Sequence, residues 1–145
     1  MIMTSIYQIQ DEIIQEFSQL SGDAEMTLCY ILKLGQHLPP MPEIYKTNEY
    51  IIKGCQSKVW IVATFENDKV YFFADSNTTI TKGLISLLIR IFNGQPPEAI
   101  VNADVYFMQK NCLERFIGTQ RSNGFAAMIN QMKRHARACN AMMEV

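Results

Sequence analysis

The chain has 145 residues, 48% of them hydrophobic, and its 13 Lys and Arg nearly balance its 14 Asp and Glu. This length and composition predict one globular domain, residues 1–145, rather than a disordered chain. The near-zero net charge gives no electrostatic case for nucleic acid as a partner. The N-terminus lacks the pattern of a signal peptide, and the most apolar stretch, residues 84–92, is too short to span a bilayer. We therefore expect a soluble, cytoplasmic protein with no membrane partner.

Two helices are predicted in the first quarter of the chain. Apolar residues recur at helical spacing from Ile6 to Phe17, and this helix should stop near residues 21–22. The carboxylate of Asp23 can accept amide hydrogens from the first turn of a second helix, which should run to Gly35. The prolines of the following sequence, HLPPMPEIY, predict an extended linker.

A β-hairpin is predicted after this linker. Residues 57–65 and 69–74 are rich in β-branched and aromatic types, and the Asn-Asp pair at 67–68 is a turn signal between them. Residues 78–92 are apolar on most sides, which is typical of a helix buried against a sheet.

The rest of the chain is predicted to be helical. The sequence PPEAIV should begin a short helix at its prolines, and residues 105–116 should hold one or two more. A final helix should begin near Ser122 and bury one apolar stripe: Phe125, Met128, Ile129, Met132 and Ala136. The predicted fold class is α+β, a small antiparallel sheet packed by helices.

Cys55 is the candidate reactive group. It follows Gly54 and precedes the first predicted strand, in a loop of the kind that presents functional side chains. Lys53 and Lys58 flank it and should favour the thiolate, which is the nucleophilic form of cysteine. From these residues alone, the alternative is a small apolar side chain tucked under a turn.

The other cysteines are predicted to be structural. Cys29, Cys112 and Cys139 fall within or between predicted helices, and we expect them to be buried free thiols. The chain has no CxxC pair, so it lacks the spacing of a zinc ribbon or a thioredoxin-like site. We predict no metal site and no bound cofactor.

Four runs of the sequence match one protein family in order and in spacing. They are LGQHLPPMPEIYKT, IIKGCQSKVWIV, ADSNTTITKG and TQRSNGFAAMI. The combination of GCQSxVW, DS followed by TKG, and RSNG resembles the SufE family of cysteine desulfuration proteins over almost the whole chain. The sulfur-accepting cysteine of that family is the one in GCQS, which corresponds to Cys55 here.

The resemblance implies a sulfur-acceptor role. Proteins of this family dock on a pyridoxal-phosphate-dependent, SufS-like cysteine desulfurase, take the outer sulfur of its persulfide, stimulate the desulfurase and deliver sulfur to an iron–sulfur scaffold complex. The resemblance also implies an IscU-like fold, a possible homodimer, no cofactor and no enzymatic turnover of its own. It places six residues near the cysteine or at the docking surface: Gly54, Gln56, Asp75, Lys82, Gly83 and Arg121.

Two positions depart from the family pattern. Asn77 stands where many members carry Asp, and Lys53 stands where others carry an uncharged residue, so the local surface is more basic. Because an exposed persulfide loses its sulfur to other thiols, we also expect Cys55 to fold inward, towards Trp60 and the apolar helix of residues 78–92, and to swing out on docking.

Three other functions stay open at the level of sequence. A regulatory module that changes a desulfurase without carrying sulfur would not need Cys55. An iron–sulfur scaffold would need several cysteines converging on one cluster. A Cys-His hydrolase would need His37 or His135 beside Cys55.

Overall fold

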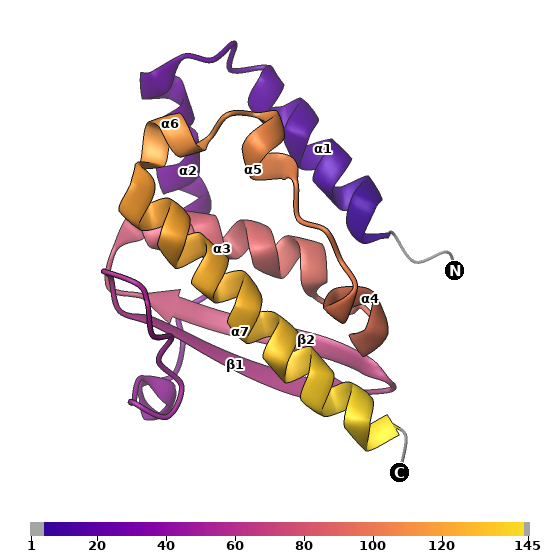
Figure 1. Ribbon diagram of the computed structural model, residues 1–145. Coiled ribbons are helices and arrows are strands. Elements are labelled where there is room, and N and C mark those ends of the chain that lie inside the picture. Colours follow the sequence, from indigo (N-terminus) through magenta and orange to yellow (C-terminus); the bar gives the residue numbers. More distant parts are fainter. Residues whose placement is uncertain (1–4, 144–145) are drawn as a thin grey trace.

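The computed structural model describes residues 5–143 and has the predicted α+β architecture. Figure 1 shows α3 and α7 lying across a two-stranded hairpin, with α1 and α2 on the other side of α3. The predicted ends of the domain, residues 1–4 and 144–145, lie outside the described residues. The described elements are α1 (Ile6–Ser18), α2 (Ala24–Gln36), the 3₁₀ helix η1 (Glu43–Tyr45), β1 (Val59–Glu66), β2 (Lys69–Ser76), α3 (Thr79–Phe92), α4 (Pro97–Val101), α5 (Phe107–Lys110), α6 (Glu114–Ile117) and α7 (Thr119–Met143).

The caps of the first two helices explain where they begin. The side chain of Ser5 accepts a hydrogen bond from the amide of Gln8, and the Gln8 side chain accepts one from the amide of Ser5. Asp23 caps α2 as predicted, because its Oδ1 accepts the amide hydrogen of Met26 at 2.8 Å. The proline linker after α2 is not wholly extended, since η1 interrupts it.

Helices α2 and α3 pack unusually closely because each carries a glycine at their contact. A Cβ atom on Gly83 would lie 2.1 Å from the carbonyl oxygen of Ile31. A Cβ atom on Gly35 would lie 2.3 Å from the carbonyl oxygen of Thr79. Gly83 therefore allows α2 and α3 to pack closely, and this contact fixes the position of α3 relative to α2.

The hairpin presents two different faces. β1 and β2 pair from Val59 opposite Ser76 to the two-residue turn, where Asn67 and Asp68 both have positive φ. One face is packed on the helices and is almost fully buried; it includes Val59, Ile61, Phe72 and Ala74. The opposite face is covered in part by the segment that follows α2, where the ring of Tyr45 lies edge-on to that of Phe73 with centroids 5.3 Å apart, and it is exposed at Tyr71.

Helix α7 begins at Thr119, earlier than the predicted start near Ser122. Gly118, at φ 85°, ends α6, and the amide of Ser122 already donates to the carbonyl of Gly118. The RSNG sequence therefore lies inside the first turns of the helix and does not precede it. Four of the five predicted stripe residues are buried, Ile129 is half-buried, and Gly124 and Cys139 join them.

The prediction of buried thiols is confirmed for Cys139 and is wrong for two other cysteines. Cys29 is exposed because the buried stripe of α2 runs along Thr27, Ile31 and Gly35, on another side of the helix. Cys112 is exposed in the turn between α5 and α6, where its φ is 52°. Neither segment gave a periodic apolar pattern strong enough to place its cysteine.

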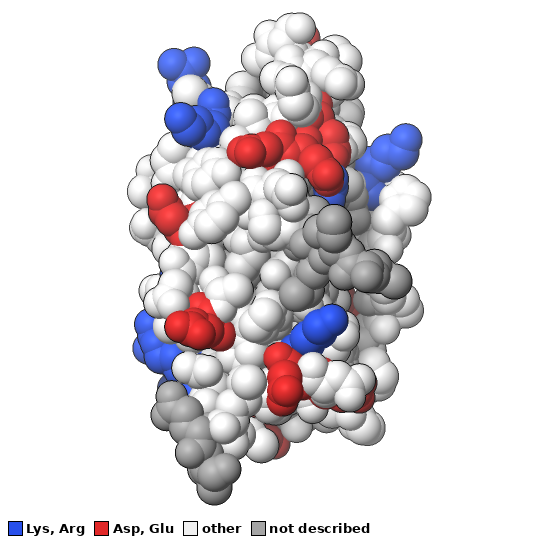
Figure 2. Space-filling view, turned by 90° about the vertical axis from the view of Figure 1, so that its right-hand side faces the viewer, with Lys and Arg blue, Asp and Glu red and all other residues white. Residues whose placement is uncertain are grey.

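The charged side chains are spread over the surface in small groups. On the face shown in Figure 2, Lys and Arg lie in separate groups with Asp and Glu between them, as the balanced composition predicts. Among the described residues, no helix combines the length and the apolar character needed to cross a membrane.

Candidate functional site

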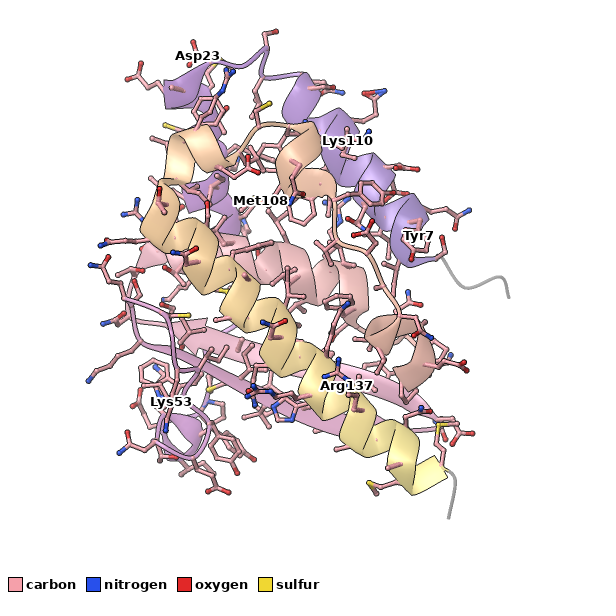
Figure 3. All side chains as sticks on the ribbon, viewed as in Figure 1. Tyr7, Asp23, Lys53, Met108, Lys110 and Arg137 are labelled. Atoms are coloured by element: carbon pink, nitrogen blue, oxygen red, sulfur yellow. The ribbon has the colours of Figure 1, made fainter. Side chains whose placement is uncertain are left out.

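Cys55 lies on a loop between Ile52 and Val59, the residues that close it at its base. The amide of Ile52 donates to the carbonyl of Val59 at 2.8 Å and closes the loop at its base. Gly54 has a φ of 94°, which allows the sharp bend before the cysteine. Figure 1 shows that this loop lies at the same end of the molecule as the first turns of α3 and α7, and Figure 3 places Lys53 on the opposite side of the molecule from Tyr7.

The thiol of Cys55 is directed against the start of α7. Its Sγ lies 3.5 Å from the carbonyl oxygen of Gly124. A Cβ atom at position 124 would lie 3.4 Å from the same sulfur, so the glycine leaves the thiol room beside the helix. The thiol is therefore half-buried, and α7 covers one side of it. We call this arrangement, with the sulfur against α7, the closed loop.

A small pocket opens beside this thiol. It has a cavity volume of about 60 Å³, which suits an added sulfur atom and is far below the roughly 300 Å³ or more of a typical small-molecule site. Most of its lining side chains are polar, and Leu84 and Met128 add an apolar part from α3 and α7. The lining residues are Cys55, Gln56, Ser57, Thr81, Leu84, Gln120, Arg121, Gly124 and Met128.

Burial raises the pKa of the Cys55 thiol above its ordinary value. The prediction that Lys53 and Lys58 would favour the thiolate is therefore wrong for the closed loop. Both lysines are exposed, so water screens them, while the sulfur is desolvated. The closed loop consequently holds a protonated, weakly nucleophilic cysteine.

The segment after Cys55 is fastened to the end of β2. The amide of Lys58 donates to Oδ1 of Asn77 at 2.9 Å, and the amide of Asn77 donates to the carbonyl of Lys58 at 3.2 Å. The hydroxyl of Ser76 also donates to the carbonyl of Lys58, at 2.7 Å. Asn77, which departs from the family pattern, therefore helps to hold the reactive loop.

Asp75 and Lys82 are partners of each other, away from the pocket wall. Asp75 is 4% exposed, and its carboxylate lies 3.2 Å from Nζ of Lys46 and 3.6 Å from Nζ of Lys82. Burial by itself would raise the pKa of Asp75, but the amide of Ser76 and the ammonium of Lys46 outweigh it and lower that pKa. Asp75 thus ties the segment after α2 to the hairpin, beneath the surface.

The other predicted site residues surround Cys55. Gln56 and Arg121 line its pocket and are exposed at the surface, where a partner can reach them. Nη1 of Arg121 donates to the carbonyl of Ile117, one turn before it. Gly54 lies against α7, because a Cβ atom at position 54 would be 3.5 Å from the Cβ of Ala127.

Trp60 is not the wall towards which Cys55 turns, contrary to the prediction. Trp60 belongs to the sheet face opposite the helices, and Nζ of Lys46 lies 5.9 Å from the centre of its ring. The apolar side chains of the pocket are Leu84 of α3, which is the apolar helix named in the same prediction, and Met128 of α7. The side chains of β1 point alternately to the two faces of the sheet, so Ile61 points towards the helices and its neighbour Trp60 points away from them.

Neither histidine lies beside Cys55 in the described structure. Nδ1 of His37 is 2.7 Å from the carbonyl of Lys33, and Nε2 of His135 is 3.3 Å from Nε2 of Gln131. A Cys-His pair is therefore not formed here. The described residues also include no group of three or more His, Cys, Asp or Glu arranged to hold a metal ion.

Sequence reasoning missed three residues that shape the site. Gly124 appears in the sequence analysis only as part of the RSNG match, and it is the residue against which the thiol rests. Ser57 and Thr81 line the pocket although neither had been singled out. Ser57 lies in the GCQS match and Thr81 in the TKG match. Their positions beside Gln56 and Lys82 were the signal that could have pointed to them.

Comparison with known proteins agrees with these features. The family model described as SufE, Fe-S metabolism associated domain, matches residues 11–136. A relative named an uncharacterized SufE-like protein, from Rhizobium meliloti (strain 1021), is 33% identical over 139 residues, which is 92% of this chain and 96% of the relative.

A solved structure shares the fold. The solution structure of a hypothetical protein from Thermus thermophilus matches with a TM-score of 0.75 at 21% identity, over 92% of this chain and 96% of that one. Because the match to the family model and the match to the relative both extend over most of the sequence, the chain belongs to the SufE family of iron–sulfur metabolism associated domains.

Proposed function

We propose that this protein accepts sulfur on Cys55 from the persulfide of a SufS-like, pyridoxal-phosphate-dependent cysteine desulfurase. It stimulates that desulfurase and passes the sulfur to an iron–sulfur scaffold complex. The observation that carries the proposal is a single half-buried thiol on a surface loop, beside a cavity of about 60 Å³. Cys55 is the only cysteine that lines this pocket.

The transfer is a thiol exchange and needs only one cysteine of this protein. The thiolate of Cys55 attacks the outer sulfur of the donor Cys–S–SH. A new S–S bond forms on Cys55, the S–S bond of the donor breaks, and the donor cysteine leaves as a thiolate. No oxidant or reductant enters, because the sulfur atom moves together with its oxidation state. The protein therefore needs no cofactor and turns over no substrate of its own.

The raised pKa of Cys55 fits a carrier whose loop moves. In the closed loop the thiol is protonated and half-buried. The same burial would shield a sulfur bound to Cys55 from other thiols. When the loop opens on a partner, the sulfur regains water and its pKa falls towards the ordinary value. Docking on the desulfurase thus couples exposure of the thiol to its activation.

The surroundings of Cys55 suit docking of another protein. Exposed side chains around the loop are polar or basic and include Lys53, Gln56, Lys58 and Arg121. A partner with an acidic rim complements them. We expect this contact in the cytoplasm, with neither nucleic acid nor membrane involved, and with a homodimer as a possible state of the free protein.

The test is the rate at which a SufS-type desulfurase forms alanine from cysteine. Wild-type protein should raise the rate, and Cys55→Ser should not, although its fold and its binding to the desulfurase persist. Cys29→Ser is the matched control, because it removes an exposed thiol elsewhere and should stimulate as wild type does. Full stimulation by Cys55→Ser would favour the regulatory module instead.

The iron–sulfur scaffold alternative lacks the convergence it requires. Cys29 is exposed on α2, Cys112 is exposed between α5 and α6, and Cys139 is buried in α7. None of the three lines the Cys55 pocket. The described cysteines therefore favour a carrier with one reactive thiol.

A further inference from the structure

Three hydroxyl groups form a closed ring beneath the Cys55 loop. Oγ of Ser57 and Oγ1 of Thr78 are 3.0 Å apart, Thr78 donates to Oγ1 of Thr81 at 2.8 Å, and Thr81 donates to Oγ of Ser57 at 3.3 Å. Because Thr78 and Thr81 use their hydroxyl hydrogens in these two bonds, the hydroxyl of Ser57 is the donor to Thr78. We call Ser57, Thr78 and Thr81 the hydroxyl ring.

The hydroxyl ring joins the reactive loop to α3. Ser57 lies two residues after Cys55, Thr78 is the N-cap residue of α3, and Thr81 is in its first turn. Each hydroxyl donates once and accepts once, so all three polar groups are satisfied in a site where Thr81 is only 5% exposed. Loss of any one hydroxyl leaves its two neighbours short of a partner.

The hydroxyl of Thr78 bonds within the hydroxyl ring and does not cap α3. A threonine at an N-cap normally accepts an amide hydrogen from the first turn of its helix. The Thr78 side chain caps no amide of α3, although its backbone takes the extended conformation of an N-cap. Its hydroxyl is used for the contact with Ser57 and Thr81.

The remaining residues of the loop are held weakly. Among residues 53–57, the side chains that make hydrogen bonds are those of Cys55 and Ser57, and the bond of Cys55 is the 3.5 Å contact of its sulfur. Ser57 is therefore the side chain through which α3 holds this stretch of the loop. Both Ser57 and Thr81 also line the pocket next to the thiol.

We propose that the hydroxyl ring of Ser57, Thr78 and Thr81 positions the Cys55 loop in its closed state and thereby sets how readily the thiol reacts. The ring touches no reacting atom and acts through the position of Ser57. The proposal deepens the proposed function, because it names the residues that regulate exposure of the sulfur-accepting group.

The first test is the alkylation rate of Cys55 with N-ethylmaleimide in the full chain, followed by peptide mass spectrometry. Thr81→Val removes a hydroxyl and keeps the shape of the side chain, and it should raise the rate about five-fold, the effect of one net hydrogen bond. Ser57→Ala should do the same. Thr81→Ser restores the hydroxyl and should return the rate to that of wild type.

A pH series separates positioning from a general loss of stability. In the Thr81→Val and Ser57→Ala variants, the midpoint of the alkylation profile of Cys55 should shift to lower pH as the sulfur regains water. Thr27→Val is the matched control: Thr27 is a 2% exposed threonine whose hydroxyl bonds to Asp23 in α2, away from the site. It should leave both the rate and the midpoint unchanged.

The proposal is overturned if folded Thr81→Val and Ser57→Ala proteins alkylate at the wild-type rate and midpoint, or if Thr27→Val changes them equally. If Thr81→Val does not fold, Ser57→Ala and the more exposed Thr78→Val decide the matter. This assay uses no desulfurase, so its outcome is independent of the proposed function. In a second arm with sulfur-loaded protein, the same variants should lose sulfur to glutathione about five-fold faster than wild type.

Discussion

At the scale of single residues, burial decides the protonation of Cys55. It favours the thiol over the thiolate and raises the pKa of Cys55. Lys53 and Lys58 do not offset this effect, because both are exposed and screened by water, whereas the sulfur lies against Gly124. A count of neighbouring charges in the sequence could not reveal this, since the sequence does not record the solvation of the sulfur.

The raised pKa of Cys55 predicts how the reaction of its thiol depends on pH in the resting protein. A raised pKa means that less thiolate is present at any given pH. The alkylation profile of Cys55 in the folded chain should therefore have its midpoint above that of the same cysteine in the chain unfolded in urea. Peptide mass spectrometry after timed alkylation at a series of pH values measures both. A folded-state midpoint equal to or below the unfolded one would show that the closed loop does not shield the thiol.

Asp75 illustrates how a residue of the motif serves the fold. Its folded-state pKa is lowered below the ordinary value of 3.8, so the ionised form stabilises the protein at neutral pH. That stabilisation is lost as the pH falls through 3.8 and below, because protonation weakens the contacts with Lys46 and Lys82. The location of Asp75 argues for an effect on stability as well as any effect on docking.

Asp75→Asn should therefore lower the urea midpoint at pH 7, and the difference from wild type should shrink towards pH 3. Equilibrium unfolding followed by circular dichroism at the two pH values measures this. Glu43→Gln is a suitable control: the Glu43 side chain is 86% exposed and contacts the same Lys46 from the solvent side. It should change stability little, as exposed ion pairs do. An equal difference for Asp75→Asn at both pH values would contradict the assigned role of the carboxylate.

At the scale of elements, the contact between α2 and α3 fixes the position of α3, which forms part of the site. α3 carries Thr81 and Leu84 into the pocket, so its position relative to the hairpin sets the shape of the pocket. That position depends on the close approach at Gly35 and Gly83. A glycine within the TKG match thus supports the site through packing, without contact with the reactive cysteine.

Gly83→Ala should destabilise the protein by about 3 kcal/mol, because the new methyl group meets the backbone of Ile31 at 2.1 Å and cannot be accommodated by a side-chain movement. The free energy of unfolding in urea is the measurement. Gly124→Ala is the matched helical substitution, with its nearest contact at 3.4 Å. Its stability should stay within about 1 kcal/mol of wild type, since alanine also favours the helix. Similar losses for both variants would contradict the packing account.

The sequence predicted the elements well where local chemistry decides them. The cap at Asp23 and the turn at residues 67–68 are short-range features, and both are present. The start of α7 was missed because Gly118 ends α6 and the helix continues through the polar RSNG sequence. The exposure of Cys29 was missed because it depends on which side of α2 packs on α3.

At the scale of the whole molecule, the site is assembled from three distant parts of the chain. The loop with Cys55, the first turns of α3 and the first turns of α7 meet at one end of the hairpin. Each part had been recognised by its motif, but their mutual placement depends on long-range packing. The motifs of Gln56 and Arg121 brought both residues to the pocket, whereas the face taken by Trp60 and the contact of Gly124 with the thiol could not be predicted.

The global arrangement also separates Cys55 from the other thiols. Cys29 and Cys112 are more exposed than Cys55, yet they lie on other elements and line no part of the pocket. If accessibility alone governed sulfur transfer, these two would be preferred. If the loop and its pocket govern it, Cys55 should be loaded first.

The most direct measurement is the mass of the protein after incubation with a SufS-type desulfurase and cysteine, followed by peptide mapping. Our account predicts an adduct of about 32 Da, one sulfur atom, on Cys55, and its absence from the Cys55→Ser variant. Cys29 and Cys112 should remain unmodified on the same timescale. An unmodified Cys55, or an adduct of equal extent on Cys29 and Cys112, would contradict the assignment of Cys55 as the sulfur acceptor.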